Sequence, residues 1–168
     1  MTLMMFDLDH FKSINDRFGH ATGDDVLKVF ASSARSSMRA DDIIARFGGE
    51  EFAAIVSGPM TNSQKIAERI RAGFEAAGAV IGDHKIGATV SIGAACAVAS
   101  QFDIEKLLSC ADAALYRAKS EGRNCVRTAD DSEPDAVTHS MAEGRSRPKL
   151  PRAKKPPLAL AANQLAVR

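Results

Sequence analysis

Tryptophan is absent from this 168-residue chain, tyrosine occurs once and cysteine three times. Cys96, Cys110 and Cys125 form no Cys-x-x-Cys pair and have no histidine at metal-ligand spacing, which indicates reduced core thiols rather than a zinc site. No apolar run approaches the roughly 20 residues that span a bilayer, and the first residues lack a basic leader and a cleavage site. A net charge of +1 gives no global attraction to nucleic acid or membranes. We expect a cytoplasmic protein.

The composition changes sharply along the chain. All eight phenylalanines and the only tyrosine lie at or before Tyr116, whereas five of the six prolines lie at or after Pro134. We therefore expect one folded domain over residues 1–128 and a disordered tail over 129–168, which lacks the apolar side chains needed to offset the entropy of ordering. The tail carries a basic cluster of Arg145, Arg147, Lys149, Arg152, Lys154 and Lys155. A solvated linker is favoured for this cluster over a nucleic-acid or lipid contact.

Hydrophobic periodicity predicts strands and helices in alternation. Strand-like apolar runs fall at 2–8, 43–47, 51–56 and 86–92. Helical spacing falls at 23–39, at 62–76 and at 103–122, where Asp103 is the expected N-cap and Gly122 the stop. Gly48-Gly49 predicts a tight hairpin with positive φ angles. The order predicts an α/β or α+β sandwich with a mainly antiparallel central sheet flanked by helices.

Carboxylates follow the first strand and the Gly-Gly pair. Asp7 stands at the exit of an apolar strand, where burial is costly unless a cation or hydrogen bonds satisfy it. Glu50 and Glu51 follow Gly49, and because neighbouring strand residues point to opposite faces, only one of them shares a face with Asp7; we choose Glu50. Hard oxygen ligands suit Mg²⁺ better than zinc. Taken alone, the Asp-x-Asp pattern is equally typical of a strand-end turn.

The motifs become specific when they are taken in order. They are DLDHFK at 7–12, NDRFGHATGD at 15–24, RFGGEEF at 46–52, VSIG at 90–93, ADAALYRAK at 111–119 and GRN at 122–124. This set resembles the GGDEF family of diguanylate cyclases, with its signature loop in the GGEEF form, over residues 1–128. The resemblance implies a nucleotidyl-cyclase or polymerase-palm-like fold with GGEEF on a β-hairpin. The implied reaction condenses two GTP molecules into cyclic di-GMP and releases pyrophosphate.

The resemblance also implies a metal site at the carboxylates. Mg²⁺ (or Mn²⁺) would be held by Asp7, the main-chain carbonyl of Leu8 and Glu50. Divalent ions there stabilise the entering 3′-oxygen and the departing pyrophosphate. Glu50 is the implied catalytic base, and Glu51 would support it through the metals or by holding the loop.

Four residues are implied to contact the nucleoside. Gly48 and Gly49, besides forming a hairpin, would let the backbone approach the nucleotide closely. Asn15 and Asp24 match the residues that hydrogen-bond the guanine edge, since an amide offers a donor and an acceptor and a carboxylate accepts from N–H groups. For Asp24 the alternative is a helix N-terminal cap.

Three cations are implied to contact phosphates. Lys12 follows the first strand, and Lys119 and Arg123, four residues apart, are expected to share one face of the last helix. Without the resemblance, Lys119 and Arg123 are more typical of a solvated helix face.

Arg39-Ala40-Asp41-Asp42 forms an R-x-x-D pattern at the position of the family's inhibitory product site. Arg39 would bind phosphate or the Hoogsteen edge of guanine, and Asp42 would accept from guanine N–H groups. The resemblance thus implies feedback inhibition by cyclic di-GMP. The alternative for the pattern alone is a helix-end ion pair.

The chain departs from the family at its front end. Family members carry a helix and a D-x-L-T-type segment ahead of the first strand, whereas this sequence starts inside the strand, so we hypothesise that Met1 is an internal methionine of a longer protein. The missing helix would leave an apolar patch on one sheet face. Catalysis needs two domains that each bring one GTP, so we expect a homodimer. The alternatives are a GTP or cyclic di-GMP binding module without turnover, and a nucleic-acid binder that uses the basic tail.

Overall fold

The computed structural model describes residues 1–97 and 103–129, so the expected tail with its basic cluster lies outside the described residues, apart from Ala129. In chain order the elements are β1 (Thr2–Leu8), α1 (Phe11–Phe18), α2 (His20–Ser36), β2 (Ile43–Arg46), β3 (Glu51–Val56), α3 (Met60–Ala77), β4 (Val80–Ile81), β5 (His84–Lys85), β6 (Val90–Cys96), α4 (Ile104–Ser120) and β7 (Val126–Thr128). Among these residues, no helix is both long enough and apolar enough to cross a membrane.

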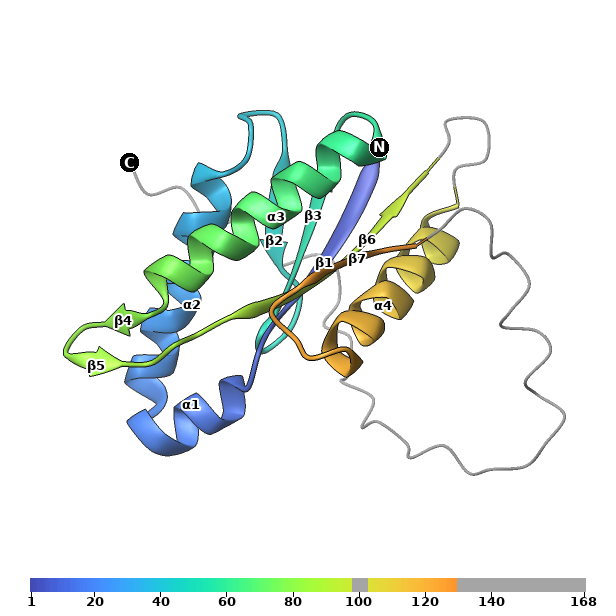
Figure 1. Cartoon of the computed structure of the whole chain (residues 1–168). Helices are drawn as coiled ribbons and strands as arrows, with labels where there is room; N and C mark the ends of the chain where they lie inside the picture. Colours follow the sequence, from blue (N-terminus) through green and yellow to red (C-terminus); the bar gives the residue numbers. More distant parts are fainter. Residues whose placement is uncertain (98–102, 130–168) are drawn as a thin grey trace, which may run out of the picture. The chain divides into compact units, whose positions relative to one another are not determined.

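The central sheet has the strand order β2-β3-β1-β6-β7. β1 pairs antiparallel with both β3 and β6, β2 pairs antiparallel with β3, and β6 and β7 are parallel. Figure 1 shows α2 and α3 on one side of this sheet and α4 on the other. The mainly antiparallel sheet flanked by helices is confirmed.

β1 lies at the centre of the sheet and is buried on both faces. Its alternate residues Met4, Phe6 and Leu8 belong to the larger core with α2 and α3. Leu3 and Met5 point the other way and pack with α4 in a smaller core. Asp7 follows in this second series, so strand alternation alone directs its carboxylate to the α4 face.

Close packing of α4 depends on Gly93 in the middle of β6. A Cβ at Gly93 would lie 2.2 Å from the carbonyl oxygen of Ala111 and 2.2 Å from the amide nitrogen of Leu115. The expectation that the strand over 86–92 ends at Gly93 is therefore wrong. β6 continues to Cys96, because the glycine serves helix packing rather than a turn.

Other boundaries also differ from the sequence analysis. The helix expected over 23–39 begins at His20 and ends at Ser36, while α1, β4, β5 and β7 were not anticipated. These missed elements have two to eight residues, too few for periodicity to register. The three cysteines are free, as expected, but half-buried rather than in the core.

Candidate functional site

The hairpin turn between β2 and β3 is closed by hydrogen bonds to its own carbonyls. The Arg46 guanidinium donates to the carbonyl oxygens of Gly48 at 3.1 Å and of Gly49 at 2.6 Å. The amides of Phe47 and Gly48 donate to the carbonyl of Glu51. Neither glycine has a left-handed φ, so the expected reason for the Gly-Gly pair is wrong. A Cβ at Gly49 would meet no atom within 4 Å, and the bare backbone is thus open to a ligand.

Asp7 and the two glutamates meet where β1 leaves the sheet. Asp7 is 9% exposed and lies directly opposite Glu51 in the strand register. Opposed residues of an antiparallel pair share a face, so Glu51 rather than Glu50 lies on the face of Asp7. The expectation that Glu50 shares this face is therefore wrong. Glu50 precedes β3, and its carbonyl accepts from the amide of Leu8 at 3.2 Å. This bond holds Glu50 beside the end of β1.

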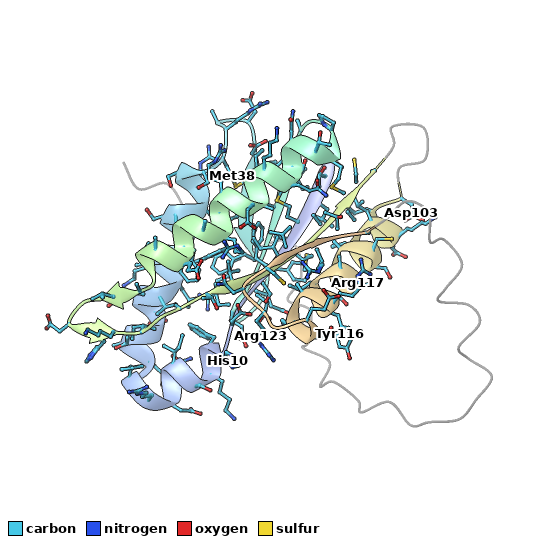
Figure 2. The ribbon with its side chains drawn as sticks, in the orientation of Figure 1. His10, Met38, Asp103, Tyr116, Arg117 and Arg123 are labelled. Carbon is cyan, nitrogen blue, oxygen red and sulfur yellow. The ribbon has the colours of Figure 1, made fainter. Side chains whose placement is uncertain are left out.

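Lys119, in the last turn of α4, provides the cation that buried Asp7 needs. Its ammonium lies 2.6 Å from Asp7 Oδ2, and the Asp7 side chain is 12% exposed. Arg123 does not share a helix face with Lys119, contrary to expectation, because α4 ends at Ser120 and Arg123 has a left-handed φ of 64°. Figure 2 shows Arg123 just past one end of α4, with the N-cap Asp103 at the other end.

Negative charge accumulates around Glu51. Burial raises the pKa of Glu51 above its ordinary value, and the Asp7 carboxylate raises it further. Lys119 opposes this shift, while Glu50 and Asp112 add to it. One ammonium thus leaves several carboxylates uncompensated, and this is an environment that favours a bound cation.

The donor set fits a hard divalent ion. In the described part of the chain, no three His, Cys, Asp or Glu side chains converge as metal ligands. The predicted ligands are instead two carboxylates, Asp7 and Glu50, and the carbonyl of Leu8. Mg²⁺ is commonly bound by one or two carboxylates and completes its shell with water and substrate phosphates, so these residues fit it.

A cleft of about 520 Å³ opens between α1, α2 and the hairpin, a volume typical of small-ligand sites. It is lined by Phe11, Lys12, Asn15, Asp16, His20, Asp24, Leu27, Arg46, Gly49 and Glu50. The structure therefore brings together the predicted residues Lys12, Asn15, Asp24, Gly49 and Glu50. Sequence reasoning missed Arg46 as a cleft residue, although its place two positions before Gly48 was a usable signal.

The part of the cleft around Asn15 depends on the absence of a side chain at Gly23. A Cβ there would lie 1.9 Å from Asn15 Oδ1 and 3.3 Å from Cζ of Phe11, so a side chain would displace the Asn15 amide. Asp24 lies inside α2, which begins at His20, so the alternative that it caps the helix is wrong. Its carboxylate is thus left to face the cleft.

The R-x-x-D turn follows the end of α2. Asp42 is 5% exposed, and its carboxylate accepts from the amides of Arg39 at 2.9 Å and Ser57 at 3.4 Å. The alternative of a helix-end ion pair is not observed between the described side chains of Arg39 and Asp42. Two further guanidinium groups lie beside this turn. Arg35 donates to the carbonyls of Asp42 at 2.8 Å and Ala40 at 3.0 Å, and Arg69 of α3 donates to the carbonyl of Ser37 at 2.5 Å.

A central antiparallel sheet, a hairpin with adjacent glutamates and a cleft beside them define an α+β domain with a carboxylate-lined ligand site. The family model described as diguanylate cyclase, GGDEF domain, matches residues 1–125, and the chain belongs to this family.

Named relatives share this domain. The chain is 40% identical over 127 residues to diguanylate cyclase DgcS of Shewanella oneidensis, which covers 76% of this chain and 42% of the relative. It is 39% identical over 129 residues to the response regulator PleD of Caulobacter vibrioides, covering 75% of this chain and 28% of the relative. The chain therefore spans less than half the length of these relatives.

Solved structures of GGDEF domains have a fold similar to that of this chain. The active GGEEF domain of a diguanylate cyclase from Vibrio cholerae has a TM-score of 0.72 and 30% identity, with 78% of this chain and 83% of that chain covered. The GGDEF domain of DgcB from Caulobacter crescentus, solved in complex with c-di-GMP, has a TM-score of 0.70 and 34% identity, with 76% and 77% covered.

Proposed function

We propose that this domain is a diguanylate cyclase that condenses two GTP molecules into cyclic di-GMP and two pyrophosphates. The observation that carries the proposal is the gathering of carboxylate residues at the end of β1, beside a cleft of about 520 Å³. Asp7 lies opposite Glu51 in the strand register, and the Glu50 carbonyl accepts from the amide of Leu8. The family membership and the active GGEEF neighbour support the same activity.

The cleft residues would bind GTP in a defined orientation. Asn15 and Asp24 hydrogen-bond the guanine edge, which selects G over A because adenine presents the reverse donor pattern. Lys12, Lys119 and Arg123 neutralise the triphosphate. The bare Gly49 backbone lets the nucleotide lie against the hairpin.

Asp7, the Leu8 carbonyl and Glu50 would hold Mg²⁺. The bound ion would stabilise charge on the attacking 3′-oxygen and the departing pyrophosphate. In each half-reaction a 3′-oxygen forms a bond to the α-phosphorus of the other GTP, and the bond from that phosphorus to pyrophosphate breaks. Glu50 takes the proton from the 3′-hydroxyl. Because each site holds one GTP, two domains must face each other, so the active form would be a homodimer.

Cyclic di-GMP would also inhibit the enzyme at the R-x-x-D turn. Arg39 is exposed, and the neighbouring Arg69 adds positive charge for a phosphate. Asp42 is largely occupied by backbone amides, so Arg39 would contribute most of the affinity. Replacing Arg39 by Ala should therefore relieve inhibition in progress curves without lowering the initial rate.

The deciding experiment incubates the purified protein with GTP and Mg²⁺ and detects cyclic di-GMP by chromatography. Replacing Glu50 by Ala should reduce the rate by on the order of 10³-fold, because it removes both the proton acceptor for the 3′-hydroxyl and one of the residues that would hold Mg²⁺. Replacing the exposed Glu105, at the start of α4, by Ala is the matched control and should leave the rate unchanged. If the protein makes no product at high concentration yet binds cyclic di-GMP by calorimetry, it is a binding module without turnover.

A further inference from the structure

Asp9 is a buried carboxylate for which the proposed reaction provides no role. It is 3% exposed and accepts hydrogen bonds from Thr89 Oγ1 at 2.8 Å, Ser91 Oγ at 2.6 Å and the Asn124 amide at 3.0 Å. A buried charge needs such donors, and these three occupy most of the acceptor sites of its two oxygens. The second carboxylate of the Asp-x-Asp pattern therefore joins three segments and does not serve as a metal ligand.

The segment that Asp9 holds is conformationally strained. Arg123 and Asn124 both have left-handed backbones, with φ of 64° and 45°, immediately after Gly122. Side chains other than glycine rarely adopt this conformation, and it persists only where the surroundings impose it. The amide of Arg123 donates to the carbonyl of Ala118 at 3.0 Å, which ties the turn to the end of α4. The next amide, that of Asn124, is the one tied to Asp9.

The Asn124 side chain is held from a second direction by α3. Its Oδ1 accepts from Arg71 Nη1 at 2.8 Å, and its Nδ2 donates to Glu75 Oε1 at 2.7 Å. Arg71 and Glu75 are themselves paired at 2.8 Å, and the Arg71 side chain is only 15% exposed. Both the oxygen and the nitrogen of the Asn124 side-chain amide are thus hydrogen-bonded, which ties the turn to α3 as well as to Asp9.

We propose that Asp9, acting through Asn124, is a positioning residue that aims the Arg123 guanidinium at the triphosphate of the bound nucleotide. Arg123 lies beyond α4, so the direction of its side chain is set by the turn and not by a helix. The same turn adjoins β1 two residues after Asp7, which places Arg123 at the end of the strand where the carboxylates gather. The inference rests on the proposed function, because that function supplies the triphosphate.

The test compares the affinities of guanosine and of a non-reactive GTP analogue with a methylene group between its α- and β-phosphates. The dissociation constant of guanosine divided by that of the analogue measures how much the phosphates contribute to binding. Replacing Asp9 by Ala should reduce this ratio about tenfold, as expected for loss of one charge-assisted contact, and leave guanosine affinity unchanged. Ala is used because an Asn side chain could still pair with the Ser91 and Thr89 hydroxyls.

Two further variants separate positioning from a general loss of structure. Asn124→Gly keeps a left-handed backbone at no steric cost and removes the side-chain hydrogen bonds to Arg71 and Glu75 of α3. It should therefore also lower the ratio while the protein stays folded. In an Arg123→Ala background, neither substitution should lower the ratio further, since Arg123 is the group that they position. Asp103→Ala, which removes the N-cap at the far end of α4, is the control and should leave the ratio at its wild-type value.

The outcomes distinguish the inference from the function on which it rests. Failure of the wild-type protein to bind the GTP analogue would refute the proposed function. Analogue binding that is unaffected by Asp9→Ala and Asn124→Gly would overturn the positioning role alone. Equal losses for guanosine and the analogue, or losses that persist without Arg123, would show that Asp9 is merely structural.

Discussion

The two faces of the central sheet differ in what their side chains do. On the α2 and α3 face, Phe30 packs against Phe6, Phe52 and Phe74 with ring centroids 4.7 to 5.6 Å apart, and every one of these rings is buried. On the α4 face, a smaller apolar cluster gives way to charged groups at the end of β1, where Asp7 pairs with Lys119. One strand thus supplies stability through one set of alternate residues and the candidate chemistry through the other.

The difference shows how a charged site is kept rigid. The aromatic face fixes the position of β1 by close packing. The α4 face over β2 is more open, since Ile43 is 61% exposed. Substitutions on the first face should therefore change stability most. On the second face, substitutions at the end of β1 should act through charge and ligand binding.

The largest effect is expected from Phe30→Ala on the aromatic face. The side chain is fully buried and contacts three other rings, so its loss should lower the free energy of unfolding by about 3–5 kcal/mol. Urea denaturation measures this. Phe47→Ala, at a ring that is 60% exposed, is the control and should stay within about 0.5 kcal/mol of wild type. Equal losses for both variants would contradict the comparison.

Gly93→Ala should have the next largest effect, through the α4 face. The new Cβ meets the backbone of Ala111 and Leu115 at 2.2 Å, and a helix backbone cannot yield as a flexible side chain would. We expect a loss of about 2–3 kcal/mol, as for other overpacked sites, with α4 displaced from β6. Thermal unfolding followed by circular dichroism tests this, and an unchanged Tm would show that α4 docks less tightly than its geometry indicates.

Lys119→Ala should have a smaller effect that depends on metal. It leaves the Asp7 carboxylate, whose side chain is 12% exposed, without its cation. In metal-free buffer the free energy of unfolding should fall by about 1–2 kcal/mol, between the values for exposed and for buried pairs. Added Mg²⁺ should restore more stability to this variant than to wild type, because the ion takes the place of the ammonium.

The exposed Lys106, also on α4, provides the matched control for this experiment. Lys106→Ala should leave both the stability and its response to Mg²⁺ unchanged. If the two lysine variants behave alike, the Asp7–Lys119 pair does not contribute to stability.

The smallest effect is expected from Glu51→Gln, and it depends on pH. The raised pKa of Glu51 means that its charged form is disfavoured in the folded state, so this group destabilises the protein as pH rises through the folded-state pKa. Without metal, the Gln variant should be slightly more stable than wild type at neutral pH. The difference should vanish in acid, below the ordinary carboxylate pKa. Tm values across pH measure it, with the exposed Glu105→Gln as control, and a less stable Gln variant at neutral pH would refute the assignment.

Much of the fold was predictable because its signals are local. β1 and β3 have the bounds expected from apolar runs, and Asp103 caps α4 as its residue type indicated. Short elements such as α1 and β7 were missed because eight and three residues carry little periodicity. A helix-capping role for Asp24 was considered because the sequence predicted that the helix starts at residue 23, whereas α2 begins at His20.

The candidate site was predictable in composition and less so in geometry. The cleft does gather Asn15, Asp24 and Glu50 from three separate segments, as their motifs implied. Strand alternation selected the wrong glutamate as the partner of Asp7, because the register starts β3 at Glu51. Register depends on how two distant segments align, and a single sequence does not specify it.

The sequence by itself determined the family, the element types and the residue types that could bind a nucleotide and a metal, because these follow from local pattern and ordered motifs. Only the tertiary structure decided that Asp7 pairs with Lys119, that Arg123 lies beyond the helix, and that Asp9 accepts three hydrogen bonds. The Asp7 and Asp9 contacts join residues 80 or more positions apart. Whether a buried carboxylate holds a metal, an ammonium or an amide depends on which of these groups folding brings within about 3 Å.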